Sequence, residues 1–216
     1  MAVLAAALQR RLPQNARRYG RDEITENRGE QPGRRHTAGV PPLYLVLGTP
    51  AAGKSTVCRA LMHRFARGLH LPIDDVRHMV VSGLADMDSG GGDPELELQL
   101  RLARQTACRT AHVYREAGFS VAIDDFWLED RPGAYYEGLQ DACRIVLRPS
   151  LEVTLERLYA RNPGEGTFKG VLAEVIPYLH ASMDASPADG WQVVDSSLLS
   201  VEETVDVILE RTGTRP

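Results

Sequence analysis

The chain has 216 residues, of which 43% are apolar, and it carries a formal net charge of −4 at pH 7. This length and apolar content are enough for one α/β domain with an appendage and a sizeable core. They exclude a membrane-spanning chain, because no run of about 18 apolar residues occurs. The apolar start precedes the first arginines, which is the reverse of the order in a secretory signal.

Charge is distributed unevenly along the chain. Residues 1–40 carry eight arginines against four acidic residues, so the remainder has a net charge of −8. This acidic body argues against broad nucleic-acid binding, which requires a basic surface. Residues 1–42 are rich in Arg, Gly, Pro, Gln and Asn, and such a segment cannot bury enough apolar surface to fold alone. We expect a disordered or weakly ordered arm, either a simple extension or a basic segment that contacts an acidic partner.

The three cysteines, Cys58, Cys108 and Cys143, lie far apart in the sequence and show no metal-ligand spacing. A sparse, odd number of cysteines is typical of reduced thiols. The sequence therefore predicts a cytoplasmic protein.

From Leu43 onward, strand-like and helix-like segments alternate, which predicts a parallel α/β sheet. Pro94 is expected to start a long helix, and Ser200 with Glu203 to form a capping box for the last one. The glycine-rich segment 86–93 is expected to be a loop that borders an acceptor pocket. Strands are expected over 43–47, 69–73, 120–123, 143–147 and 191–194, and helices over about 54–67, 76–84, 94–117, 134–142, 151–161, 171–183 and 201–211.

The most informative stretch is the glycine-rich segment between the first strand and the first helix, which matches the Walker A pattern. Its glycines let backbone N–H groups turn inward, and the start of the helix adds its own free N–H groups. Lys54 is expected to reach the β- and γ-phosphates of ATP, and Ser55 to hold Mg²⁺. The alternative is a glycine-rich turn that precedes a helix by chance. The predicted nucleotide contacts in this segment are Gly48, Ala51, Ala52, Gly53, Lys54, Ser55 and Thr56.

Two aspartates follow the apolar strand over 120–123. Ligands bind at the carboxyl ends of strands in an open parallel sheet. Asp124 is therefore expected to hold Mg²⁺ as a Walker-B-type carboxylate, directly or through water. The alternative is an aspartate that accepts hydrogen bonds from backbone N–H groups of the following loop. Asp125 could instead hold an acceptor.

The segment Asp74-Asp75-Val76-Arg77 follows the second strand. A carboxylate here could take the proton from an attacking hydroxyl group, and we favour Asp74 over Asp75 for this role. Arg77 could orient that base or grip an acceptor. The alternative is an N-terminal helix cap followed by a surface arginine.

Two arginines lie four residues apart on the helix after the fourth strand. Arg157 and Arg161 share a helical face, and from a closing lid they could neutralise charge on a transferred phosphoryl group. The alternative is a solvated helix face on which Arg157 pairs with glutamates. After the last strand, the loop that begins at Asp195 is expected to lie beside the adenine of ATP.

The order of these motifs resembles the P-loop kinases of the nucleoside-monophosphate-kinase-like superfamily. The resemblance covers residues 43–211 and is greatest to the 5′-kinase domain of polynucleotide kinases and to related small AAA-type ATP-binding proteins. It rests on the P-loop, on Leu71–Arg77, on the strand ending in Asp124-Asp125, and on the helix with Arg157 and Arg161. A weaker similarity, through residues 123–126, is to chloramphenicol phosphotransferase-like kinases.

This resemblance implies a three-layer α/β/α P-loop NTPase fold with a five-stranded parallel sheet in the order 2-3-1-4-5 and a helical lid. It also implies that the first aspartate of 74–77 is the general base and that the arginine contacts the transferred phosphate or the acceptor. The sequence departs from the family at Glu165, where the lid usually carries another basic residue, and it lacks an accompanying phosphatase domain.

These residues together predict an ATP- and Mg²⁺-dependent kinase that moves the γ-phosphate of ATP to a hydroxyl group of a small molecule. Two alternatives remain open. One is a nucleic-acid 5′-hydroxyl kinase with the arm as its basic surface, and the other is an ATP-binding regulatory ATPase without an acceptor. The predicted catalytic residues are Lys54, Asp74, Arg77, Arg157 and Arg161, and the predicted metal ligands are Ser55 and Asp124.

Overall fold

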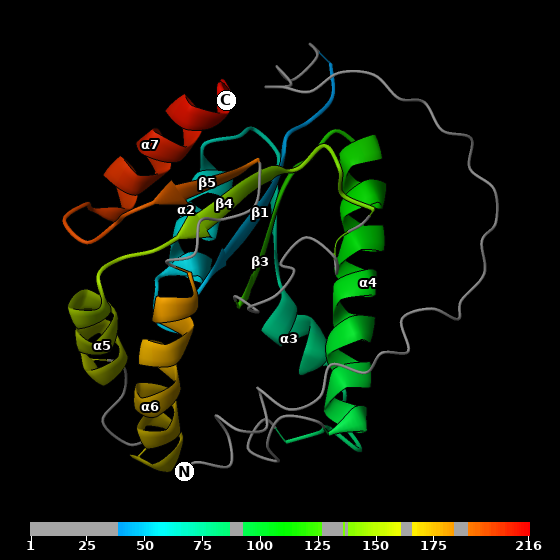
Figure 1. The fold of residues 1–216 in the computed structure, drawn as a ribbon. Coiled ribbons are helices and arrows are strands. Elements are labelled where there is room, and N and C mark those ends of the chain that lie inside the picture. Colours follow the sequence, from blue (N-terminus) through cyan, green and yellow to red (C-terminus); the bar gives the residue numbers. More distant parts are fainter. Residues whose placement is uncertain (1–38, 87–92, 127–135, 137, 161–165, 184–189) are drawn as a thin grey trace.

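A five-stranded parallel sheet forms the centre of the molecule (Figure 1). The computed structural model describes residues 39–86, 93–126, 136, 138–160, 166–183 and 190–216, without the side chains of 166–169. The strand order is β2-β3-β1-β4-β5 and every neighbouring pair is parallel, which confirms the expected order. The strands are β1 (Leu43–Gly48), β2 (Gly68–Pro72), β3 (Ser120–Phe126), β4 (Cys143–Leu147) and β5 (Trp191–Val194).

The central strand β1 is buried along its whole length, because helices cover both faces of the sheet. Its side chains alternate between two cores. Leu45 and Leu47 pack in the core on the side of α4 (Pro94–Glu116). Tyr44 and Val46 pack in the core formed with α2 (Lys54–His63) and α7 (Val201–Thr212). This double coverage explains the uninterrupted apolar run of the first strand.

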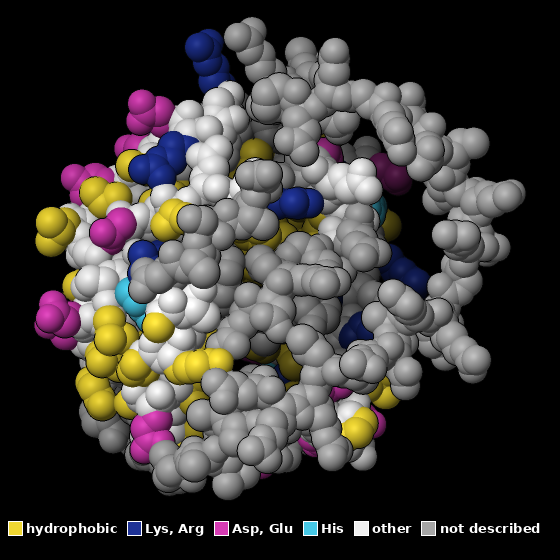
Figure 2. All heavy atoms as spheres, viewed as in Figure 1, with side chains coloured by type: hydrophobic (Ala, Val, Ile, Leu, Met, Phe, Trp, Pro, Cys, Tyr) yellow, Lys and Arg dark blue, Asp and Glu magenta, His cyan; other side chains and the backbone are white. Residues whose placement is uncertain are grey.

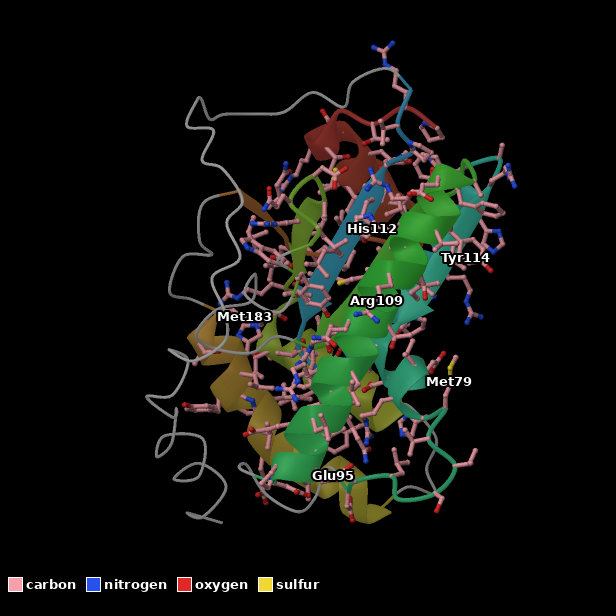
Figure 3. All side chains as sticks on the ribbon, turned by 90° about the vertical axis from the view of Figure 1, so that its right-hand side faces the viewer. Met79, Glu95, Arg109, His112, Tyr114 and Met183 are labelled. Carbon is pink, nitrogen blue, oxygen red and sulfur yellow. The ribbon has the colours of Figure 1, made fainter. Side chains whose placement is uncertain are left out.

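The long helix α4 presents a stripe of small residues to the sheet, and Ala103, Ala107 and Ala111 are buried there. Figure 3 looks onto α4, which runs along this face of the sheet. The helix begins as expected, because the Asp93 side chain accepts a hydrogen bond from the Glu95 N–H at 2.9 Å. At the other end of the chain, Ser200 and Glu203 form the expected capping box of α7.

The helices α5 (Leu151–Ala160) and α6 (Gly166–Ser182) pack against each other beside the end of the sheet where α3 (Ile73–Arg77) also lies (Figure 1). Leu158 of α5 and Ile176 of α6 form a small buried cluster with Ala51. This pair corresponds to the helical lid in the expected fold. It is in direct apolar contact with the loop that was predicted to bind phosphate.

The region after β2 differs from the expectation. A strand was expected over 69–73 and a helix over 76–84, but β2 ends at Pro72 and α3 (Ile73–Arg77) follows immediately. Pro72 lacks the N–H that would continue the ladder, and its extended backbone caps the helix. Two aspartates occupy the first turn of α3, where the helix dipole favours negative charge.

Three other boundaries differ. The helix α2 ends at His63 rather than near 67, because Gly68 passes so close to the Met62 carbonyl that only glycine fits. The helix α6 begins at Gly166 rather than 171. A helix was expected over 134–142, but residues 138–142 form turns, and most of the preceding residues lie outside the described part of the chain.

The described surface carries charges of both signs. On the face shown in Figure 2, Lys and Arg side chains are scattered among Asp and Glu side chains. No helix in the described ranges is both long and apolar enough to cross a membrane. The three cysteines are free thiols. The predicted arm lies outside the described residues as far as residue 38.

Candidate active site

The loop between β1 and α2 has the backbone geometry of an anion cradle. A Cβ at Gly48 would collide with the carbonyl oxygen of Leu147 in β4, so this position requires glycine. Ala51 has a φ of 62° and Gly53 a φ of 94°, both in the left-handed region. Within the described residues, no side chain caps the start of α2. The first backbone N–H groups of the helix can therefore donate to a bound anion.

Ala51 adopts a conformation that costs a non-glycine residue roughly 1–3 kcal/mol. The buried cluster of Ala51 with Leu158 and Ile176 holds this conformation in place. Strain of this kind is typical of functional loops. The geometry therefore couples the shape of the predicted phosphate-binding loop to the α5–α6 pair.

Lys54 lies at the first position of α2, and its Nζ donates a hydrogen bond to the Thr49 carbonyl at 2.9 Å. The ammonium group thus folds back over the loop. The positive charge of Lys54 opposes the rise in the pKa of Asp74 and contributes to the lowered pKa of Asp124. The Lys54 ammonium group therefore interacts electrostatically with both of the predicted functional carboxylates.

Ser55 and Asp124 are brought together from two elements. The Ser55 hydroxyl donates to Oδ2 of Asp124 at 2.6 Å. Burial alone would raise the pKa of Asp124, but the adjacent His70 imidazole, the hydrogen bond from Ser55 and the charge of Lys54 outweigh it, so the pKa is lowered. A serine oxygen beside an ionised carboxylate is the hard oxygen donor set that Mg²⁺ takes, so these residues fit the ion.

The strand β3 continues through Asp124 and Asp125 rather than ending at 123. Successive side chains of a strand point to opposite faces. Asp124 therefore faces Ser55 and His70, whereas Asp125 faces α4. The two adjacent aspartates therefore face different sides of the sheet, and only Asp124 lies beside Ser55.

Asp125 is held in a buried polar network. Its Oδ2 accepts hydrogen bonds from Arg104 Nε at 2.6 Å and from the Tyr136 hydroxyl at 2.7 Å. Its Oδ1 accepts the Phe126 N–H at 2.8 Å. The side chains of Arg104 and Asp125 are 4% and 2% exposed. These contacts assign Asp125 to a buried network that supports the carboxyl end of β3.

Asp74 lies in the first turn of α3 and keeps contact with solvent. Its pKa is raised, first because the surrounding protein desolvates it and second because the Asp125 carboxylate lies nearby; Lys54, Arg77 and His78 act in the opposite direction. A raised pKa suits a group that must accept a proton. Asp75 is also exposed.

Arg77 is 4% exposed, and the structure places it in the support of the following segment. Its Nη1 donates to the Ala85 carbonyl at 2.9 Å, and Nη2 lies 3.3 Å from Nε2 of His78. The Gln99 side chain of α4 also holds this segment, accepting from the Ala85 N–H at 3.0 Å. A contact between Arg77 and a transferred phosphate stays a prediction.

Arg157 of α5 bridges the loop after β1 and the loop after β5. Its Nη1 donates to the Ala52 carbonyl at 3.1 Å and its Nη2 to the Ser196 carbonyl at 3.0 Å. The other predicted lid arginine, Arg161, lies outside the described residues. The alternative, in which Arg157 pairs with neighbouring glutamates, does not describe this side chain, because its hydrogen-bond partners are these two carbonyl groups. A contact between Arg157 and a transferred phosphoryl group stays a prediction.

A cavity of about 330 Å³ opens beside Arg157. Ser196 of the loop after β5 contributes to its wall, and the Asp195 carboxylate accepts the Ser197 N–H at 2.8 Å. That this loop lies beside the adenine of ATP stays a prediction. This volume lies at the lower end of the range of small-molecule sites. The lining residues are Ala51, Ala52, Gly53, Thr56, Val57, Arg157, Ala160, Ser196, Leu199, Val201 and Thr204.

Sequence reasoning missed several supporting side chains. His70 lies in β2, and its Nε2 is 3.4 Å from Oδ1 of Asp124, a contact that requires knowing that β2 and β3 are neighbours. Arg104 had a visible signal, because it lies four residues after Leu100 on the apolar stripe of α4. Tyr136 had no such signal, because nothing in the expected helix over 134–142 pointed to a contact with Asp125.

No protein-family model matches the chain, and no curated protein matches it. Solved structures do match, at a probability of 1.00. The tunicamycin resistance protein of Deinococcus radiodurans is 16% identical with a TM-score of 0.59, and the match covers 81% of this chain and 97% of that one. A sugar kinase from Janibacter sp. HTCC2649 is 16% identical with a TM-score of 0.57, covering 82% and 96%.

Shikimate kinase from Bacteroides thetaiotaomicron is a further match, 13% identical with a TM-score of 0.55, covering 80% of this chain and 98% of that one. These similarities, together with the strand order, show that the chain has a P-loop kinase-like fold, a three-layer α/β/α arrangement.

Proposed function

We propose that this chain is an ATP- and Mg²⁺-dependent phosphotransferase that moves the γ-phosphate of ATP to a hydroxyl group of a small molecule. One observation carries the proposal. The positive charge of Lys54 in the phosphate-binding loop acts on both Asp74 and Asp124, and of these two carboxyl groups Asp124 has a lowered pKa and Asp74 a raised one. A protein that only binds ATP needs a carboxylate for the metal, whereas a second carboxylate with a raised pKa is suited to take the proton of an attacking hydroxyl group.

In this proposal, the backbone N–H groups of the loop and Lys54 bind the ATP phosphates, and Arg157 and Ser196 border the nucleoside. Ser55 and Asp124 hold Mg²⁺, which supplies positive charge at the phosphate oxygens when bound. Asp74 accepts the proton of the acceptor hydroxyl as its oxygen attacks the γ-phosphorus. The bond from the γ-phosphorus to the bridging oxygen breaks, and ADP leaves with the electron pair.

The raised pKa of Asp74 supports the role of base over that of a simple helix cap. A cap would gain from the N-terminal dipole, which favours the ionised form and lowers a carboxyl pKa. Here desolvation and the Asp125 charge dominate instead. Arg77 and Arg161 remain proposed contacts to the acceptor or the phosphoryl group.

The acceptor is best found by a screen for transfer of labelled γ-phosphate from ATP. The panel should contain sugars, nucleosides, shikimate, tunicamycin-like and other antibiotics, and 5′-hydroxyl oligonucleotides, because three structural neighbours are named for a sugar kinase, shikimate kinase and tunicamycin resistance. Lys54→Ala serves as the blank. Arg59→Ala is the matched control, because it removes a positive charge from an exposed position of the same helix.

Transfer to a small hydroxyl compound that is lost in Lys54→Ala and kept in Arg59→Ala would support the proposal. Transfer to oligonucleotides alone would replace it with the nucleic-acid kinase hypothesis, and deletion of residues 1–40 would then be expected to abolish oligonucleotide binding. Release of inorganic phosphate with no acceptor product would favour a regulatory ATPase.

A further inference from the structure

A thiol, an imidazole and a carboxylate meet behind the proposed Mg²⁺ site. Cys58 comes from α2, His70 from β2 and Asp124 from β3. One ligand atom of each lies within 4.8 Å of the others. Cys58 is fully buried, and the His70 and Asp124 side chains are 10% and 4% exposed. These residues are far apart in the sequence, so cysteine spacing gave no hint of the cluster.

One nitrogen of the His70 imidazole is buried without a hydrogen-bond partner among the described residues. Among the described residues, its buried Nε2 has no partner at hydrogen-bond geometry, and its contact with Oδ1 of Asp124 is an ion-pair approach at 3.4 Å. Burying a polar nitrogen in this way is costly unless a partner satisfies it. The free lone pair of a neutral imidazole is also the group that binds a metal ion.

The two oxygens of Asp124 face different partners. Oδ2 accepts the Ser55 hydroxyl on the side of the phosphate-binding loop, and Oδ1 lies toward His70. On the loop side the donors are oxygens, which suit Mg²⁺. On the His70 side the set is sulfur, nitrogen and oxygen, which suits Zn²⁺ and similar ions rather than Mg²⁺.

We propose that Cys58, His70 and Asp124 form a binding site for a thiophilic divalent cation of the Zn²⁺ class, and that an ion held there competes with Mg²⁺ for Asp124. Ligand atoms around tetrahedral zinc stand about 3.2–3.8 Å apart, given bond lengths of about 2.0–2.3 Å. The His70 and Asp124 atoms already meet this spacing, and from a separation of 4.8 Å the Cys58 sulfur would need to move by roughly 1–1.6 Å.

Binding must displace a proton. Burial, aided by the Asp124 charge, raises the pKa of the Cys58 thiol, so the free site holds a neutral thiol. When the ion binds, the S–H bond breaks, a sulfur–metal bond forms and the proton passes to the buffer. The existence of this site does not depend on the proposed function. The competition with Mg²⁺ does rest on it, because it requires Asp124 to be a Mg²⁺ ligand.

Cobalt titration of the full chain tests the site directly. Co²⁺ is a visible substitute for Zn²⁺, and a thiolate ligand gives it a charge-transfer band in the near ultraviolet. We expect about one equivalent of Co²⁺ to produce this band in a thiol-free buffer and Zn²⁺ to remove it. Cys58→Ser should abolish the band, and His70→Gln should weaken Co²⁺ binding about tenfold or more. Cys108→Ser is the matched control and should keep the band.

The remaining outcomes are decisive. No band in the native chain, or an unchanged band in Cys58→Ser, overturns the site whatever the enzyme does. If Cys58→Ser does not fold, as judged by circular dichroism, His70→Gln decides, and unchanged Co²⁺ affinity there overturns the site. Adding Mg²⁺ and ATP should weaken Co²⁺ binding. A band that is unchanged by Mg²⁺ and ATP would keep the site but refute the competition, because the two oxygens of Asp124 would then bind the two ions at once.

Discussion

The buried pair of Arg104 and Asp125 makes a quantitative prediction about stability. Both side chains are almost fully buried, and the Nε–Oδ2 distance is 2.6 Å. Replacing Arg104 with methionine keeps much of the volume but leaves the carboxylate without its charged partner. Removing one member of a buried ion pair costs about 3–5 kcal/mol. For a chain of this size, that loss corresponds to a fall of roughly 6–20 °C in the midpoint of thermal unfolding.

The assay is urea unfolding followed by circular dichroism for Arg104→Met, Asp125→Asn and the double variant. In each single variant one charge remains buried, whereas the double variant removes both. The two losses should therefore not add, with a coupling free energy of about 2–3 kcal/mol. In Asp125→Asn the Tyr136 hydroxyl can still donate to the amide oxygen of the new side chain, so the double variant keeps one hydrogen bond of the network.

The exposed pair of Arg64 and Asp206 is the matched control, since its side chains are 41% and 58% exposed. Arg64→Met should cost no more than about 1 kcal/mol, because water screens such pairs. A loss below about 1 kcal/mol for Arg104→Met, or additive effects in the double variant, would refute the assignment of Asp125 to an internal support.

Three further predictions concern the candidate active site. Asp124→Asn should raise the Mg²⁺ concentration required for ATP binding by about tenfold or more, measured by isothermal titration calorimetry; an unchanged requirement would contradict its role as ligand. Asp74 must be ionised to accept a proton, and its pKa is raised. The transfer rate should therefore fall as the pH drops through a value above the usual aspartate range. Asp74→Asn should abolish transfer, and with it this fall of the rate at acidic pH. Arg157→Lys cannot span both the Ala52 and Ser196 carbonyls, so ATP affinity should fall about tenfold; equal affinity by calorimetry would argue against that bridge.

Much of the fold could be predicted because its signals are local. The Walker A loop lies between a fully buried strand and an amphipathic helix, and both were visible in the sequence. The capping box of α7 was visible for the same reason. The strand order came from the resemblance to P-loop kinases, since nothing local in a parallel strand states which strand will be its neighbour.

The errors arose at residues whose local sequence is compatible with two different structures. Pro72 ends a strand and also caps a helix, so α3 begins directly after it. Asp124 and Asp125 were interpreted as the loop after a strand, although they continue the strand and point to opposite faces. The partners of these aspartates, His70 and Arg104, come from distant elements. Contacts of that kind become visible only after the sheet is assembled.

The fate of the γ-phosphate tests the proposed function most directly. Phosphorus NMR of the chain with ATP, Mg²⁺ and the acceptor found by screening separates a phosphate ester from inorganic phosphate. We predict that the native chain forms the ester and that Asp74→Asn loses it by about a hundredfold or more, with ATP affinity unchanged. Inorganic phosphate as the only product, formed equally well by Asp74→Asn, would contradict the proposal that this chain transfers phosphate to an acceptor.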